Sequence, residues 1–310
     1  MIVVDSHCDS IQLVDRGKAP LVNPHNFSTR YKQLQFVAMF CAADPENPNA
    51  AYHKTVRYIG QYLIALEKEK DCIVGVSSYA DIERAFAENK HASLLAIEGG
   101  SGIKGSTQIL SDFYAIGVRV FGLAWLTNEL AKSNRLAPDE EDTGLTELGR
   151  EVVAKGNELG LLFDVSHLSD QSFYDVLSLS KKPILATHSN FRTLCAHSRN
   201  LTDDMARRLV ESDGMIGLNL YPPFIDSVAE CATVDRYFDH LDYCIDRFGS
   251  DNIGFGGDID GTSGEYPVSV TEDSSIHDQL IDVMYRRGYS TEIIEKFCYR
   301  NYMNFLKKYL

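Results

Sequence analysis

The chain has 310 residues, of which 44% are hydrophobic and 24% charged, which is the composition of a folded globular protein and not of a disordered one. Its net charge of −14 and its pI of about 5.1 disfavour binding to nucleic acid or to an anionic membrane surface. It has no signal-like N-terminal segment and no long apolar run, and its seven cysteines are scattered without a CxxC pair, so we expect a cytoplasmic protein with reduced thiols.

The first nine residues predict a short buried strand that ends in metal ligands. An apolar run at residues 2–4 leads directly into Asp-Ser-His-Cys-Asp. Because side chains alternate between the two faces of a strand, His7 and Asp9 point to one face and Cys8 to the other. An imidazole beside a carboxylate supplies half of a site for a divalent ion, although a hydrogen-bonded His/Asp pair is an alternative. The other ligands must come from the rest of the chain.

Residues 10–91 show a less regular pattern. The polar stretch at 10–33 predicts a long loop, and the apolar run at 36–41 predicts a second buried strand. The helical spacing of apolar side chains then predicts two amphipathic helices, one over residues 56–66 and one that begins near Ser78.

From residue 92 onward, short apolar runs alternate with helical periods. The predicted strands are 93–97, 118–124, 161–165, 183–186, 215–220 and 253–255. The predicted helices are 107–115, 146–159, 170–179, 203–211, 234–248, 276–287 and 291–309. With the two earlier strands, this alternation favours an α/β fold, a (β/α)8 TIM-type barrel that forms a single domain over residues 1–310. An open doubly wound sheet is the alternative, but the glycine-rich phosphate turn that normally follows its first strand is missing.

Ionisable residues occur where the predicted strands end. These residues are His7, Asp9, Glu98, His167, His188 and Asp258. The carboxyl ends of the strands of a βα barrel form one rim, where active sites are built, so we expect the six side chains to converge. Such a set can hold two divalent ions, with Glu98 contributing one oxygen to each. Taken singly, a histidine near a strand end is more often a hydrogen-bonded structural residue than a metal ligand.

Six motifs resemble those of the membrane dipeptidase (renal dipeptidase) family, in the same order. They are DSHCDS, AIEGG around Glu98, FDVSH ending at His167, ATHSN around His188, AHSRNLTDD through Arg199 and GFGGDIDG around Asp258. The resemblance extends from residue 3 to about residue 305.

This resemblance implies an amidohydrolase-like barrel with two zinc ions and small dipeptides as substrates. It implies that His7 and Asp9 bind one ion, that His167 and His188 bind the other, and that Glu98 bridges both. It also implies that Asp258 is the catalytic acid/base, and that Arg199 binds the substrate's C-terminal carboxylate, with a D-residue tolerated at that end.

Elementary chemistry agrees with these roles. Two divalent ions, zinc in preference, would activate a water for attack on the peptide carbonyl. The leaving amine needs a proton, which Asp258 can supply, and Asp260, on the same face by strand alternation, ranks second. The planar fork of Arg199 suits a carboxylate, but a surface salt bridge is the commoner role of an arginine. Tyr221, at the end of the seventh strand, lines the pocket or belongs to the core.

One position departs from the family pattern, because Trp125 stands where family members often have a histidine that polarises the scissile carbonyl. Either a nearby donor such as Asn128 replaces that histidine, or the metal polarises the carbonyl alone. Two other functions stay open: a metal-dependent hydrolase of cyclic amides, lactones or nucleobases, and a barrel that binds a ligand or one structural metal without catalysis. A homodimer is also left open.

Overall fold

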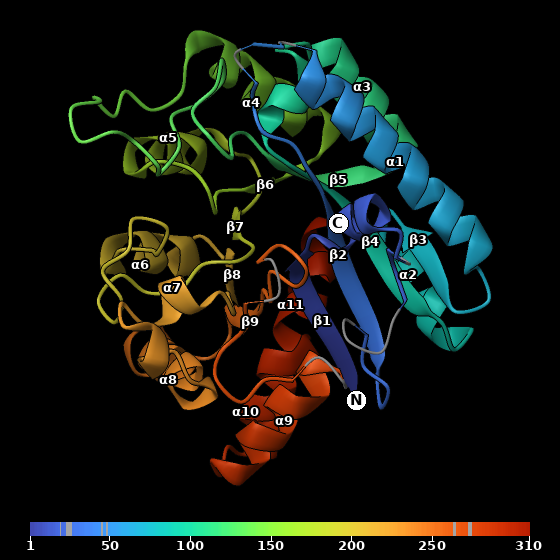
Figure 1. Ribbon diagram of the computed structural model, residues 1–310, viewed down its shortest axis with the longest axis vertical. Coiled ribbons are helices and arrows are strands. Elements are labelled where there is room, and N and C mark those ends of the chain that lie inside the picture. Colours follow the sequence, from blue (N-terminus) through green and yellow to red (C-terminus); the bar gives the residue numbers. More distant parts are fainter. Residues whose placement is uncertain (19, 23–26, 45, 48, 263–264, 272–274) are drawn as a thin grey trace.

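Eight parallel strands close into a barrel at the centre of the protein, as seen in the computed structural model (Figure 1). The structure describes residues 1–18, 20–22, 27–44, 46–47, 49–262, 265–271 and 275–310. The barrel strands are β1 (Ile2–Cys8), β2 (Lys32–Phe40), β4 (His91–Glu98), β5 (Val118–Gly122), β6 (Leu162–Asp164), β7 (Leu185–Ala186), β8 (Met215–Leu218) and β9 (Ile253–Phe255). The ring closes because β1 pairs with β9 and β2 pairs with β4. The predicted (β/α)8 barrel is therefore confirmed.

A ninth strand, β3 (Ile73–Val76), lies outside this ring and was not predicted. It pairs with the first half of β4, while β5 pairs with the second half. Its sequence, Ile-Val-Gly-Val, is a short apolar run between the two flanking helices that we did not assign to a strand.

Helices surround the barrel (Figure 1). They are α1 (Ala50–Lys68), α2 (Tyr79–Ala87), α3 (Thr107–Ile116), α4 (Glu147–Leu159), α5 (Asp170–Leu179), α6 (Asp203–Glu211), α7 (Pro222–Ile225), α8 (Val234–Phe248), α9 (Ile276–Arg286), α10 (Thr291–Glu295) and α11 (Asn301–Tyr309). Many begin at a serine or threonine whose hydroxyl accepts a backbone N–H, as Thr146 does from Gly149. Such a cap stabilises a helix by about 0.5–2 kcal/mol. None of the helices in the described ranges combines the length and the apolarity needed to cross a bilayer.

Two predicted segments differ in detail. The stretch at 10–33, expected to be a loop, contains a 3-10 helix at Ser10–Arg16, and its residues 19 and 23–26 lie outside the described part of the chain. The last predicted helix is α10 and α11 joined by a π-helical turn at Lys296–Arg300. That turn lies against β1 and β9, so packing rather than local propensity accounts for it.

The apolar core has a part inside the barrel and a part under the outer helices. Leu94 and Ala96, which alternate with Glu98 along β4, share one buried cluster with Tyr302 and Phe305 of α11. Because these strand residues precede Glu98, α11 fills the end of the barrel opposite to the strand ends. The carboxyl-terminal rim is left for the polar residues.

Candidate metal centre and cavity

The structure brings the six predicted rim residues together, with Glu98 at their centre. One oxygen of Glu98, Oε2, lies 3.6 Å from His7 Nε2. The other, Oε1, lies 2.8 Å from His167 Nε2 and 3.7 Å from His188 Nε2. His7 Nε2 is also 3.5 Å from Asp9 Oδ2. The two oxygens of one carboxylate thus face two separate groups of potential ligands, His7 with Asp9 and His167 with His188.

Local irregularities of the backbone direct these side chains. The pairing of β1 with β2 shifts register between Asp5 and Cys8, which interrupts the alternation of side chains. Asp5 accepts a hydrogen bond from His277 of α9 on the outside, whereas His7 stacks on His188 at 3.6 Å between ring centroids. After Glu98 the chain turns at Gly99, whose φ of 101° suits glycine and whose Cβ would overlap the Cys41 carbonyl oxygen.

The electrostatics of this group indicate that a cation belongs in it. Burial, together with the neighbouring Asp9 carboxylate, raises the pKa of Glu98 to about 8. Burial lowers the pKa of His167 and of His188. For His7, burial alone would lower the pKa, but the Glu98 and Asp9 carboxylates outweigh it and the pKa is raised. Neighbouring carboxylates repel one another when all are ionised, and a bound divalent ion would offset this repulsion.

Two unpartnered atoms test whether a metal fits. His7 Nε2 and Glu98 Oε2 are buried without a hydrogen-bond partner and face each other. Buried polar atoms normally have partners, so this pair calls for an explanation. Ligands that share a tetrahedral zinc ion at about 2.1 Å lie roughly 3.4 Å apart. The separations around His7 are close to that value, and the mixed nitrogen and oxygen donors suit a borderline ion such as zinc. The residues present therefore fit a metal.

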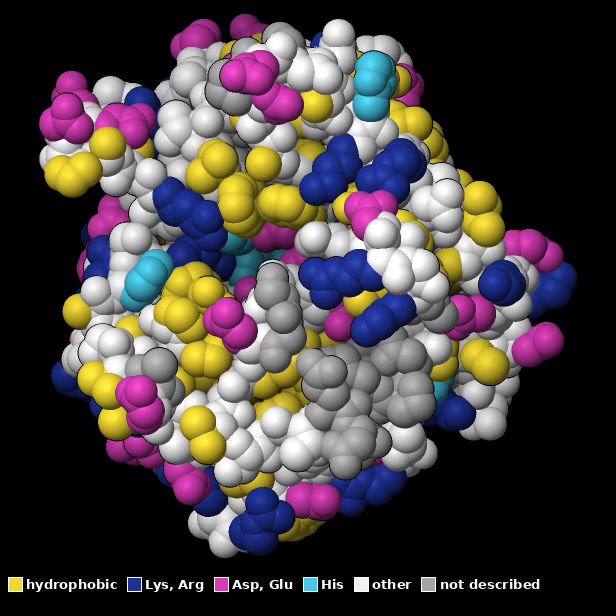
Figure 2. Space-filling model, in the orientation of Figure 1, with side chains coloured by type: hydrophobic (Ala, Val, Ile, Leu, Met, Phe, Trp, Pro, Cys, Tyr) yellow, Lys and Arg dark blue, Asp and Glu magenta, His cyan; other side chains and the backbone are white. Residues whose placement is uncertain are grey.

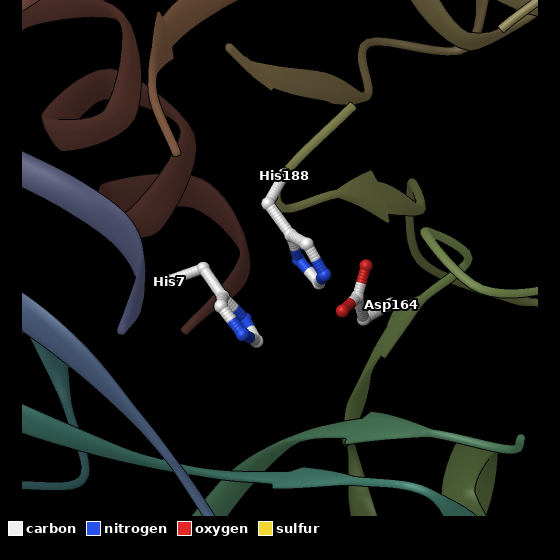
Figure 3. A group of neighbouring side chains, drawn as sticks. All are labelled: His7, Asp164 and His188. Atoms are coloured by element: carbon white, nitrogen blue, oxygen red, sulfur yellow. The ribbon is translucent and has the colours of Figure 1, made fainter. Parts of the chain in front are cut away.

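Asp164, which sequence reasoning missed, supports this site from the last position of β6. It forms a close group with His7 and His188, and its carboxylate lies beside the His188 ring (Figure 3). Its Oδ1 accepts hydrogen bonds from the Ser166 hydroxyl at 2.6 Å and from the Thr187 N–H at 3.0 Å, and its Oδ2 accepts from the Thr187 hydroxyl at 2.6 Å. With its oxygens engaged in this way, Asp164 is better placed to orient ligands than to bind an ion.

The Thr187 hydroxyl fixes the tautomer of His188. Thr187 Oγ1 is 2.8 Å from His188 Nδ1, and its single proton is donated to Asp164. It must therefore accept from Nδ1–H of His188, which leaves a lone pair on Nε2, the atom that faces Glu98. Such outer hydrogen bonds hold a metal-binding imidazole in the protonation state and orientation that it needs.

This chain of hydrogen bonds gives a first prediction. Thr187→Val keeps the shape of the side chain but removes the acceptor for His188 Nδ1, so the affinity for zinc should fall by roughly 10- to 100-fold. Competition with a chromophoric chelator measures this affinity directly. Thr187→Ser keeps the hydroxyl and should bind nearly as tightly as the wild type. Equal affinities of the valine and serine variants would show that Thr187 does not position His188.

A cavity of about 340 Å³ opens over the ligands. Figure 2 shows the hollow near the centre of this face, with histidine and acidic side chains at its floor. Its walls are formed by Phe40, Trp125, Arg135, Tyr221, Phe224 and Glu265. A larger cavity of about 420 Å³ lies between α1 and β3, but it contains none of the clustered ligands, so we place the functional site in the smaller one.

Asp258 lines this cavity, with Oδ1 3.9 Å from His7 Nε2. Asn219 Nδ2 donates to Asp258 Oδ2 at 3.0 Å and fixes the carboxylate, and burial raises the Asp258 pKa. Asp260, which ranked second as the acid/base, accepts a hydrogen bond from Ser10 at 2.7 Å and does not line the cavity. The chain reaches this arrangement through Gly261, because a Cβ there would overlap the Asp258 carboxylate.

Arg199 lies beneath the ligands and does not line the cavity. It is 2% exposed and donates to the backbone carbonyl oxygens of Ser166 and His188, while its Nη2 lies 3.3 Å from His167 Nε2. Burial lowers its pKa to about 10. Its Nε is buried without a partner, and within the described ranges no carboxylate forms an ion pair with it. Tyr221 does line the cavity, packed edge-on against Phe224.

Trp125 also forms part of the wall, 5.9 Å from the His167 ring between centroids. Asn128, one candidate for a substitute donor, is engaged elsewhere: its Nδ2 donates to Leu123 O at 2.9 Å, and its Oδ1 accepts from Leu130 N–H at 2.8 Å. It holds its own loop together and does not line the cavity.

Comparisons with known proteins agree with this geometry. Residues 1–309 match the family model described as membrane dipeptidase, peptidase family M19. An uncharacterized protein in the pqqA 5' region of Klebsiella pneumoniae is 34% identical over 240 residues, which cover 74% of this chain and 86% of that protein. Dipeptidase tcpJ of Claviceps purpurea is 30% identical over 84% of this chain, but the match spans only 62% of that longer protein. A solved structure titled dipeptidase AC, a metallo peptidase of family M19, superposes with a TM-score of 0.88 at 26% identity, covering 100% of this chain and 98% of that one.

Proposed function

The chain belongs to the membrane dipeptidase family, peptidase family M19, and on this premise we propose that it hydrolyses dipeptides with two divalent metal ions, zinc in preference. One observation carries the proposal: the two oxygens of Glu98 face two separate groups of ligands. His7 and Asp9 would hold one ion with Glu98, and His167 and His188 would hold the other with it.

Two bound ions would supply a Lewis acid for the substrate carbonyl and a water of lowered pKa for attack on it. The protein's own residues must manage the proton. Asp258 lies beside the ligands, held by Asn219, and can pass a proton to the departing amine nitrogen. Without that proton the amine is a poor leaving group.

The free carboxylate of the dipeptide is assigned to Arg199. Its guanidinium is buried beside His167, and no carboxylate of the described chain forms an ion pair with it, although the nearby Asp258, Asp164 and Glu98 oppose the lowering of its pKa by burial. Because Arg199 does not line the cavity, a substrate carboxylate would have to reach past the lining residues to pair with it. Recognition of this group would restrict the enzyme to short substrates, and we include dipeptides with a D-residue at the C-terminal position among them.

The test uses the full chain, stripped of metal with a chelator and then reconstituted with zinc. We expect hydrolysis of several members of a panel of L-L, L-D and D-L dipeptides, and little hydrolysis of tripeptides. Cyclic amides and lactones form a second arm of the panel, because hydrolases of those substrates can be built on the same barrel. Turnover in that second arm alone would overturn the dipeptidase proposal. No turnover in either arm, with two ions bound, would favour a non-catalytic barrel.

Arg199 gives a second prediction. Amidation of the dipeptide removes a charge-assisted pair that is worth ~1.5–3 kcal/mol, so kcat/KM should drop roughly ten- to a hundredfold. Arg199→Ala should cause a similar drop on the free dipeptide but little further change on the amide, because both changes remove the same interaction. Losses that simply add in this cycle would show that Arg199 does not contact the carboxylate.

A further inference from the structure

Arg135 places a cation at the mouth of the cavity. Its guanidinium carbon lies 4.1 Å from the centroid of the Trp125 ring, and the residue is exposed and lines the cavity. It forms no ion pair with any residue in the described ranges, unlike most arginines of this chain. An arginine stacked on an aromatic ring keeps its hydrogen-bonding edge free, and less entropy is lost when it binds a planar anion.

The segment that carries Arg135 is fixed beside the metal ligands. The preceding residue, Asn134, donates from its backbone N–H to His167 O at 3.0 Å and from its side chain to Ser166 O at 3.1 Å. Trp125 in turn packs edge-on against Phe40 at 4.8 Å. The cation therefore belongs to the wall on the His167 side of the cavity.

We propose that Arg135 binds a carboxylate of the substrate, and that the enzyme therefore favours dipeptides that carry an acidic side chain. This inference rests on the proposed dipeptidase function. The other charged side chains lining the cavity are acidic, namely Asp9, Glu98, Asp258 and Glu265. The proposed metal ions would lie among the ligands on the floor, so at the mouth Arg135 is the side chain of the lining that offers a positive charge to an anion. With Arg199 assigned to the α-carboxylate, the second carboxylate is that of a side chain. Arg135 could bind the α-carboxylate by the same chemistry, so the experiment below distinguishes the α-carboxylate from a side-chain carboxylate.

The kinetic test compares matched substrates, Ala-Asp with Ala-Asn and Asp-Ala with Asn-Ala, on the wild type and on Arg135→Gln. In one of these two pairs, the wild type should show a kcat/KM for the acidic dipeptide that is roughly five- to thirtyfold higher than for the Asn-containing one. This range lies between the contribution of an exposed ion pair and that of a well-aligned bidentate pair. Arg135→Gln should abolish this preference and leave Ala-Ala hydrolysis nearly unchanged. Arg135→Lys keeps the charge without the planar fork and should fall between.

If Arg135 instead binds the α-carboxylate, Arg135→Gln will slow all dipeptides with a free C-terminus alike. It will leave dipeptides whose C-terminus is amidated unchanged. Equal effects on every substrate, amidated ones included, or no effect at all, would overturn the proposal.

A binding measurement separates this inference from the dipeptidase proposal. Trp125 is the sole tryptophan of the chain, so its fluorescence reports on the cavity mouth. In the zinc-loaded Asp258→Asn variant, Ala-Asp should change this emission at a concentration at least fivefold lower than Ala-Asn does. Adding Arg135→Gln should remove the difference. Selective binding of the acidic dipeptide with no turnover by the wild type would contradict the dipeptidase function and support the role of Arg135. Turnover with no such selectivity would support the dipeptidase function and contradict the role of Arg135.

Discussion

Replacing Asp258 with asparagine is expected to lower kcat by roughly 10²–10⁴-fold while the metal content stays near that of the wild type. Asparagine has the same shape and can still pair with Asn219, but it cannot transfer a proton. Burial raises the Asp258 pKa, which is the direction that a proton donor to a leaving amine needs. Steady-state kinetics together with metal analysis of the same sample measure both quantities.

Asp260→Asn is the matched variant for this experiment. Asp260 is two residues away and has a similar left-handed backbone, with φ of 69° against 53° for Asp258, but its carboxylate accepts from Ser10 and does not line the cavity. The fall in kcat of Asp260→Asn should therefore be much smaller than that of Asp258→Asn. Full activity in Asp258→Asn with a large loss in Asp260→Asn would transfer the proton-shuttling role to Asp260.

Glu98→Gln should lower metal occupancy at both positions, from about two zinc ions per chain to fewer than one, and should abolish most activity. Glutamine offers one oxygen in place of two and carries no charge, so it cannot serve the His7 side and the His167 side together. Elemental analysis of protein reconstituted with zinc gives the stoichiometry, and a melting curve confirms that the variant is folded.

Glu265→Gln removes another carboxylate from the same cavity and serves as the matched control for metal content. It lies among the lining residues but outside the clusters of ligands, so two ions should remain bound. Loss of only one ion in Glu98→Gln would contradict a bridging role and place Glu98 in a single site.

The sequence predicted that the rim residues would lie close together, because of how they are placed along the chain. His7, Glu98 and His188 each follow an apolar run, and the ends of parallel strands in a closed barrel must meet. The residue that supports His188, Asp164, could not be found in this way. The sequence shows it only as part of a predicted strand, whereas its role depends on the pairing of β6 with β7 and on the Thr187 hydroxyl.

Other features depend on contacts that leave no periodic signal. Arg135 lies in a long segment between β5 and α4, and its place at the cavity mouth follows from the hydrogen bonds of Asn134 to the turn at His167. The burial of Arg199 follows from bonds to backbone carbonyl oxygens, which its motif does not show. In both cases the sequence gives the residue type, and the packing of loops decides which arginine reaches the cavity.

The hydrogen bonds of Asp164 have a mechanical consequence for the barrel wall. Strands β6 and β7 share a single register pair, Asp164 with Leu185. Beyond that pair, Val165 N–H donates to Leu185 O and His188 N–H donates to Ser166 Oγ. The Asp164 side chain adds two further bonds, to the N–H and to the hydroxyl of Thr187. The same threonine aims His188. Parting of these strands at the rim would break the hydrogen bonds that orient His188, so the closure of the wall and the alignment of this proposed metal ligand depend on the same bonds.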